Sequence, residues 1–127
     1  MIVIDASVAV LALLNDGNAR SLLATEAIAA PHLVDSEVAH ALRGQVIRRV
    51  ITANQGRSAL DVWARMGVQR FAIPGLLDRV WALRGNLSAY DASYVALAES
   101  LGCPLVTADV RISGAPGPSC PITIIRR

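Results

Sequence analysis

Short runs of apolar, mostly β-branched residues recur along this chain, and stretches with helical character separate them. The first run, Ile2-Val3-Ile4, opens the sequence and ends at Asp5. A strand that is apolar on both faces is typical of a parallel sheet, which needs cover on both sides. Strands that alternate with helices therefore predict an α/β fold with a mainly parallel sheet.

Hydrophobic periodicity and the positions of Gly and Pro place the expected elements. Strands are predicted over residues 2–4, 68–73, 104–107 and 122–125. Helices are predicted over residues 6–14, 18–30, 34–49, 52–65, 74–84 and 88–101. The Gly- and Pro-rich residues 113–121 predict a loop. With 127 residues, the chain is expected to form one domain, residues 1–127.

The composition excludes several classes of protein. At 54% hydrophobic and 17% charged residues, the chain is too apolar for a disordered tail. All 12 basic residues are Arg, so a Walker-type phosphate loop and Schiff-base or pyridoxal-phosphate chemistry, which need Lys, are excluded. The two cysteines, Cys103 and Cys120, are too few for a disulfide framework.

The expected location is the cytoplasm, without a membrane anchor. No apolar run reaches the ~18 residues that span a bilayer. The apolar residues 6–14 do not form a signal peptide, because Asp5 lies where such peptides carry positive charge.

Four of the ten acidic residues are expected at one edge of the sheet. Asp5 and Asp109 follow the carboxyl ends of apolar strands, and Glu37 and Asp91 lie in the first turns of helices. In a βαβ unit the helix N-terminus lies at the carboxyl edge of the strands, where open α/β sheets bind ligands.

Each carboxylate also has a purely structural interpretation. Asp5 and Asp109 are candidate N-caps, Ser88 and Asp91 match a capping box, and Glu37 interacts favourably with the helix dipole. Asp35 is interpreted as a cap of the helix that starts beside it. Four converging carboxylates repel one another, however, and a divalent cation relieves that repulsion. Oxygen ligands favour Mg²⁺ or Mn²⁺ over zinc, and two such ions can clamp a phosphodiester.

The charge outside this candidate site favours a nucleic-acid substrate. Without the four carboxylates, 12 arginines face six acidic residues, a net charge of +6. Arg43, Arg48 and Arg49 share one predicted helix, and we interpret them as a solvated face, with phosphate binding as the alternative. Trp63 and Trp81 lie in amphipathic helices and are interpreted as core or dimer-interface residues.

The motifs around these carboxylates resemble the PIN domain and, more closely, its VapC-type toxin ribonucleases. The resemblance extends over nearly the whole chain in order. It rests on residues 2–7 (IVIDAS), 31–42 around Glu37, 87–99 (LSAYDASYVALAE) and 105–109 (LVTAD). The blocks that contain Tyr90-Asp91 and Thr107-Ala108-Asp109 are its most specific parts.

The resemblance implies a three-layer α/β/α sandwich and a Mg²⁺- or Mn²⁺-dependent endoribonuclease that hydrolyses structured RNA, such as tRNA or rRNA. It implies a homodimer and a small VapB-like antitoxin that occupies the active site. By match of motif, the catalytic residues are Asp5, Glu37, Asp91 and Asp109. Asp5 and Asp91 would bind metal directly, and Glu37 and Asp109 directly or through water.

Three further residues are expected to support this site. Ser7 and Thr107 resemble hydroxyl positions that orient the carboxylates, although helix capping or strand-end hydrogen bonding would also explain them. His40 stands where the family often has Asn, and it could bind Glu37 or a substrate phosphate, although a helix-face His bonded to backbone or water is the favoured interpretation. The chain also enters its Gly/Pro-rich loop soon after Asp109, where the family usually continues into a clear helix.

Two alternatives stay open at this point. One is a PIN nuclease that acts on another nucleic acid, and the other is a non-catalytic PIN-like binding module. The binding module would be marked by a missing carboxylate, and all four are present. An α/β phosphatase with an Asp nucleophile is excluded, because Asp5-Ala6-Ser7 lacks the second Asp of that motif.

Overall fold

The computed structural model describes residues 1–126 and contains one parallel five-stranded sheet of order β3-β2-β1-β4-β5. The strands are β1 (Ile2–Ile4), β2 (Ile28–Pro31), β3 (Val68–Phe71), β4 (Leu105–Thr107) and β5 (Ile122–Ile124). The helices are α1 (Ala6–Leu14), α2 (Asn18–Thr25), α3 (Val34–Ile47), α4 (Ala53–Arg65), α5 (Leu77–Ala82), α6 (Ala89–Leu101) and α7 (Val110–Gly114), with a 3₁₀ turn η1 (Pro74–Leu76) before α5.

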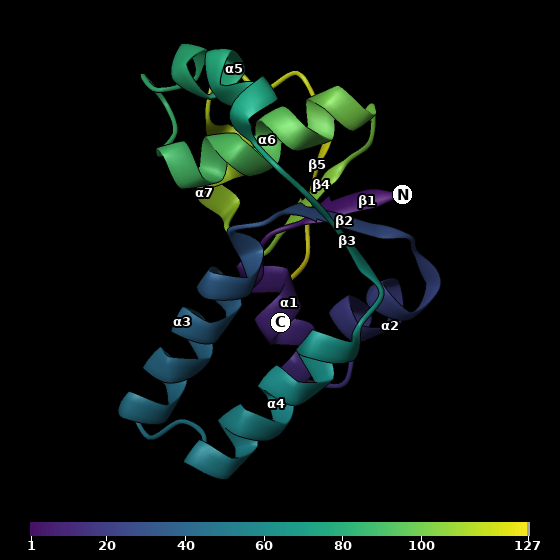
Figure 1. The fold of residues 1–127 in the computed structure, drawn as a ribbon, viewed down its shortest axis with the longest axis vertical. Coiled ribbons are helices and arrows are strands. Elements are labelled where there is room, and N and C mark those ends of the chain that lie inside the picture. The colour runs from purple at the N-terminus through teal and green to yellow at the C-terminus, as the bar shows by residue number, and fades with distance from the viewer. Residues whose placement is uncertain (127) are drawn as a thin grey trace.

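The sheet lies between two layers of helices, as Figure 1 shows. Helices α1 to α4 cover one face, and α5 and α6 cover the other. This arrangement confirms the predicted α/β/α sandwich, and the described strands are all parallel. None of the described helices is long and apolar enough to cross a bilayer.

The centre of the sheet is apolar on both faces, as the first strand predicts. All three residues of β1 are buried, and so are all four of β2. Helix α6 packs its buried residues 92–98 against this centre. Because both faces of the inner strands are covered by helices, Asp5 at the end of β1 lies in a largely buried environment.

The strand order creates a switch point beside β1. From β1 the chain adds β2 and β3 on one side, then crosses over and adds β4 and β5 on the other. At the carboxyl ends of the neighbouring strands β1 and β4, the chain therefore continues in opposite directions along the sheet. Open α/β sheets bind ligands at such a point. Asp5 and Asp109 follow these two strands.

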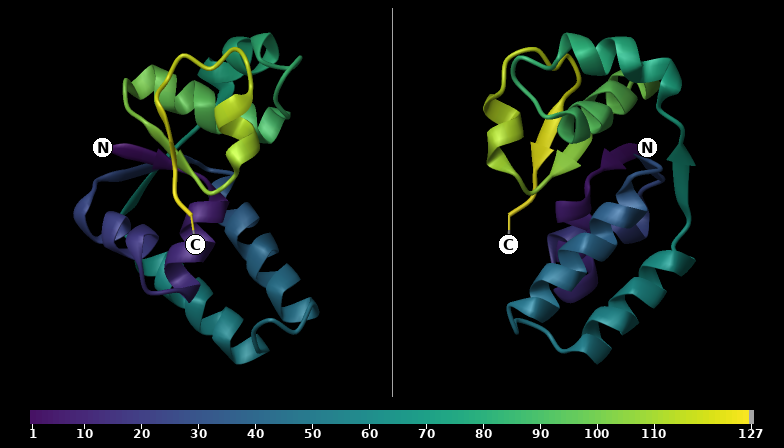
Figure 2. Two further views of the ribbon diagram at one scale, coloured as in Figure 1. Left: turned by 180° about the vertical axis from the view of Figure 1, so that it is seen from behind. Right: turned by 60° about the vertical axis from the view of Figure 1, so that its left-hand side comes forward.

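Helices α3 and α4 form an antiparallel hairpin that extends away from the sheet (Figures 1 and 2). A capping box starts α4: the Thr52 hydroxyl accepts the Gln55 N–H at 3.1 Å, and the Gln55 side chain accepts the Thr52 N–H at 2.8 Å. The hairpin packs on α1 and fixes the helix that carries Glu37.

The structure corrects three predictions. The helix expected over residues 18–30 ends at Thr25, and residues 28–31 form β2, which pairs with strands on both sides. The loop expected from residue 113 begins after a short helix, α7. Asp35 caps no helix: its carboxylate accepts the Trp63 indole N–H at 2.8 Å and the Arg70 Nε–H at 2.7 Å.

Candidate active site

Asp5 forms the buried centre of the candidate site. It caps α1 by accepting the Val8 N–H at 3.2 Å, and its Oδ1 also accepts the Ser7 hydroxyl at 2.5 Å. The Thr107 hydroxyl donates to the second oxygen, Oδ2. Only 7% of Asp5 is exposed, and this burial raises the pKa of its carboxyl against the opposing effect of the hydrogen bonds. Asp5 is thus a helix cap and an oriented, desolvated carboxylate at once.

Glu37 reaches the same region from the first turn of α3. The Tyr94 hydroxyl on α6 donates to its Oε1 at 2.5 Å. Burial raises the pKa of Glu37, and the negative charges of Asp91 and Asp5 raise it further. The pKa of Tyr94 is also raised, first by burial and then by this hydrogen bond. The phenol therefore stays protonated and holds the carboxylate in place.

Asp91 contributes the third negative charge, from the first turn of α6. The Ser88 hydroxyl accepts the Asp91 N–H at 3.1 Å, so Ser88 caps the helix. Within residues 1–126, the Asp91 carboxylate itself makes no hydrogen bond or salt bridge, and the reciprocal half of the predicted capping box is not formed. Its charge contributes to the raised pKa of Asp5, after burial. The carboxylate of Asp91 is left available for a ligand.

Asp109 lies at the same edge of the sheet, but its carboxylate engages an arginine. It caps α7 by accepting the Arg111 N–H at 3.0 Å, and the Arg111 guanidinium grips it with Nη2–Oδ2 at 2.7 Å and Nε–Oδ1 at 3.0 Å. This guanidinium lowers the pKa of Asp109. The negative charge of Asp91 thus lies close enough to add to the effect of burial on the pKa of Asp5 and Glu37, whereas Asp109 is paired with Arg111.

The supporting residues predicted from the sequence divide into two groups. Ser7 and Thr107 both donate to Asp5, and their hydroxyls also accept the N–H groups of Ala108 and Asp109, each at 3.0 Å. They thus tie the end of β1 to the end of β4. His40 is exposed, and no hydrogen bond joins it to Glu37 in the part of the chain that the structure describes.

The donor set fits a hard divalent cation, although the side chains do not form a closed chelate. Among residues 1–126, no three His, Cys, Asp or Glu side chains are grouped closely enough to hold an ion as they stand. The acidic side chains nevertheless present oxygen ligands only, the type that Mg²⁺ and Mn²⁺ prefer. The raised pKa values of Asp5 and Glu37, caused first by burial, mark negative charge that a bound cation would stabilise.

Two residues of this region were not predicted as site residues. Tyr94 could have been found, because its position three residues after Asp91 places both on one face of α6. Arg111 carries a weaker signal, a cation two residues after Asp109. Both act on a carboxylate of the site, one as a hydrogen-bond donor and one as a counter-ion.

Buried and partly buried carboxylates at the switch point of a parallel α/β sheet fit the class of metal-dependent hydrolases, which includes enzymes that act on phosphodiesters. Comparison with known proteins identifies the family within this class. A model of the PIN domain matches residues 2–117. Ribonuclease VapC9 of Mycobacterium tuberculosis is 56% identical over 127 residues, which cover 100% of both chains. Ribonuclease VapC1 of the same organism is 43% identical, covering 98% of this chain and 97% of its own.

A solved structure supports the same fold. The VapBC2 structure from Rickettsia felis, bound to a DNA fragment from its promoter, superposes with a TM-score of 0.69 at 16% identity, covering 96% of this chain and 97% of that chain. The chain belongs to the PIN domain family, in its group of VapC ribonucleases.

Proposed function

We propose that this chain is the toxin of a toxin–antitoxin pair and acts as a Mg²⁺- or Mn²⁺-dependent endoribonuclease on structured RNA, such as tRNA or rRNA. The observation that carries the proposal is the convergence of Asp5, Glu37 and Asp91 at the switch point of the sheet. The full-length similarity to VapC ribonucleases supports the choice of RNA as substrate.

Asp5 and Asp91 would hold the metal directly, and Glu37 and Asp109 directly or through water. When bound, the cation would lower the pKa of a coordinated water and neutralise charge on the phosphodiester. Ser7 and Thr107 fix the orientation of Asp5 through their hydroxyl groups. This support matters because a misoriented ligand weakens metal binding by about ten- to a hundredfold.

Glu37 is better suited than Asp109 to accept a proton from the attacking water. Burial raises the pKa of Glu37, whereas Arg111 lowers the pKa of Asp109, so Glu37 is the stronger base. Tyr94 holds the Glu37 carboxylate at 2.5 Å and limits its rotation. Attack by water in line with the leaving 3′-oxygen would yield a 5′-phosphate and a 3′-hydroxyl.

An apolar groove between α1, α2 and α4 suits the helix of a small VapB-like antitoxin, whose continuation would occupy the active site. The groove contains two neighbouring cavities of about 450 and 460 Å³ that share Leu13 and Val62. An amphipathic helix places apolar side chains into such a groove. A homodimer is proposed as well, and the exposed Leu77 and Trp81 on α5 offer an apolar contact for it. The pair would act in the cytoplasm, where tRNA and rRNA are found.

The deciding experiment is cleavage of a total RNA pool with Mg²⁺, Mn²⁺ or EDTA. We expect cuts at discrete sites with either metal, none in EDTA, and at least about a hundredfold slower cleavage by Asp5→Asn and Asp91→Asn. Asp78→Asn removes the same charge at an exposed position on α5 and should cleave normally. Equal cleavage by all four proteins, or cleavage that persists in EDTA, would refute the proposal.

A parallel reaction on single-stranded DNA separates the substrates. Cleavage of DNA in place of RNA would identify a PIN nuclease for another nucleic acid. No cleavage of either, together with no metal binding by calorimetry, would identify a non-catalytic binding module.

A further inference from the structure

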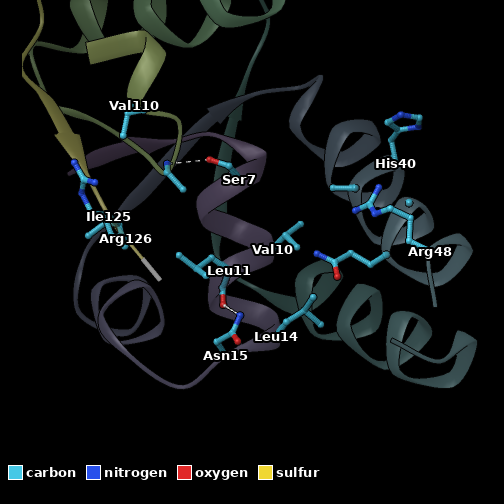
Figure 3. A pocket seen from close by; sticks show the side chains of 14 residues that line it. Ser7, Val10, Leu11, Leu14, Asn15, His40, Arg48, Val110, Ile125 and Arg126 are labelled. Atoms are coloured by element: carbon cyan, nitrogen blue, oxygen red, sulfur yellow. Dashed lines mark hydrogen bonds between the residues drawn. The ribbon is translucent and has the colours of Figure 1, made fainter. Parts of the chain in front are cut away.

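A cavity of about 620 Å³ opens directly beside the candidate active site, between α1, α3 and the end of β5. Ser7 and Ala108 line its edge, and the Ser7 hydroxyl that bonds Asp5 also accepts the Ala108 N–H. Figure 3 shows this bond at one end of the cavity. A molecule in the cavity would therefore continue into the carboxylate site.

The walls of the cavity combine an apolar surface with basic side chains. Helix α1 contributes the apolar Val10, Leu11 and Leu14. Figure 3 shows His40 and Arg48 on one side of α1 and Arg126 on the other. Among the described residues, no Asp or Glu lines the cavity, in contrast to the neighbouring site. This surface would attract an anion with an apolar part.

Both arginines are free to bind such an anion. Four other arginines among residues 1–126 are paired with a carboxylate: Arg57, Arg70, Arg79 and Arg111. Arg48 and Arg126 form neither a salt bridge nor a side-chain hydrogen bond within the part of the chain that the structure describes. An unpaired guanidinium can bind a phosphate through two parallel N–H donors.

Gly44 allows Arg48 to lie against α3. A Cβ built on Gly44 would lie 3.1 Å from Nη1 of Arg48, so the guanidinium lies close to the position that a side chain would take. Both residues line the cavity, one helical turn apart. The lack of a side chain at position 44 thus lets the guanidinium lie back along the helix at the wall of the cavity.

We infer that this cavity binds a nucleotide of the RNA next to the cleaved phosphodiester, with Arg48 and Arg126 on backbone phosphates and the α1 wall against a base or sugar. The inference rests on the proposed function, because it extends the substrate beyond the catalytic carboxylates. The volume falls within the range of ligand pockets. Cations along the backbone and an apolar surface for the base are the usual elements of single-strand recognition. An acidic peptide would also pair with the arginines, but RNA is favoured because the cavity adjoins the site at which its backbone would be cleaved.

The test measures affinity for a short fluorescein-labelled stem-loop RNA by fluorescence anisotropy in EDTA. We expect Arg48→Ala and Arg126→Ala each to weaken binding about three- to tenfold and to reduce the salt-dependence slope by about 1. Arg84→Ala is the matched control: it removes the same charge at an exposed position two residues after α5, which does not line the cavity, and should bind like wild type.

Gly44→Ala tests the position of the guanidinium without any change of charge. Alanine favours a helix over glycine, so the melting temperature should stay equal or rise. The new methyl group would move the Arg48 guanidinium by a few tenths of an ångström, and RNA affinity should fall by about twofold. A fall in affinity without a fall in stability separates this effect from damage to the fold.

Unchanged affinity and salt slope in all three cavity variants would overturn the inference and leave the cavity to a protein segment. If wild type still cleaves RNA with Mg²⁺ or Mn²⁺ in that case, the proposed nuclease function stands. If wild type cleaves no RNA with either metal, the proposed function fails, and the measured affinities still decide whether the cavity binds RNA.

Discussion

The hydroxyl of Tyr94 donates to Oε1 of Glu37 at 2.5 Å and links α6, on one face of the sheet, to α3 on the other. Tyr94 is 2% exposed, so its hydroxyl depends on this partner. The bond crosses the edge of the sheet at which Asp5 and Asp91 also lie. A single contact thus positions a carboxylate of the site and joins two helical layers.

Tyr94→Phe should therefore affect both stability and catalysis. Loss of a partly buried hydrogen bond to a charged group should lower the free energy of unfolding by about 1–2 kcal/mol. Cleavage should slow by about tenfold, because Glu37 is no longer oriented. Urea unfolding and single-turnover RNA cleavage measure the two effects.

Tyr90→Phe is the control for this variant. Tyr90 is 64% exposed on the same helix, and the change should alter neither quantity. If Tyr94→Phe loses stability but cleaves at the wild-type rate, Tyr94 is structural only.

Metal binding should stabilise the wild-type protein. A cation that binds only the folded state, at about 100 times its dissociation constant, adds about 2.7 kcal/mol to the free energy of unfolding. The melting temperature should therefore rise with Mn²⁺ and return to its starting value in EDTA. Asp5→Asn should lose this response, because it removes the most buried of the candidate oxygen ligands.

Asp78→Asn should keep the full response to Mn²⁺, because its carboxylate is exposed on α5. An equal rise in melting temperature for Asp5→Asn and the wild type would show that the metal binds elsewhere.

The positions of Asp5 and Asp109 could be predicted from sequence because each depends on a local pattern. An apolar strand that ends in Asp places that Asp at the carboxyl edge whatever the rest of the chain does. Strand β2 could not be found in this way. Its residues Ile28-Ala29-Ala30 include two alanines, which favour a helix, and its pairing with β1 and β3 overrides that preference.

Contacts between residues far apart in the sequence could not be predicted from local patterns either. Asp35 meets Trp63 and Arg70, which lie 28 and 35 residues away, so no cap signal could reveal its role. The Tyr94–Glu37 bond spans 57 residues and depends on how α3 and α6 meet across the sheet. The partner of a side chain is thus a property of the tertiary structure even where the residue itself is predictable.

Glu99 should make the stability of the protein depend on acid pH. The Arg79 guanidinium donates to it at 2.7 and 3.0 Å, Ser119 donates from N–H and hydroxyl, and these contacts lower its pKa to about 2 from an ordinary 4.5. Between these values the unfolded state binds more protons than the folded state, so stability falls as the pH falls. The stabilisation is complete above pH 4.5 and lost near pH 2.

We expect this loss to amount to about 1–2 kcal/mol, less than the full pKa shift implies, because Arg79 is partly exposed to solvent. Glu99→Gln should be less stable than wild type at neutral pH, and the difference should shrink toward pH 2. Urea unfolding across this range measures it, with Glu26→Gln as the control, because the ion pair of Glu26 with the N-terminus is long at 3.7 Å and exposed. A difference that stays constant with pH would contradict the assignment.

Arg111 should limit the access of metal to Asp109. Its guanidinium holds both carboxylate oxygens and lowers the pKa of Asp109, so the carboxylate is already satisfied by a counter-ion. In Arg111→Ala the pKa of Asp109 should rise toward its ordinary value, which NMR titration of the side-chain carboxyl carbon measures. The affinity for Mn²⁺ should rise a few-fold by calorimetry, because a ligand of the site is released. Stability should not change, because the arginine is exposed.

Arg84→Ala, with the same loss of charge at a distant position, should leave both the pKa of Asp109 and the affinity for Mn²⁺ unchanged. If Mn²⁺ affinity is the same in Arg111→Ala as in the wild type while the pKa of Asp109 rises, Asp109 is a cap of α7 and not a metal ligand.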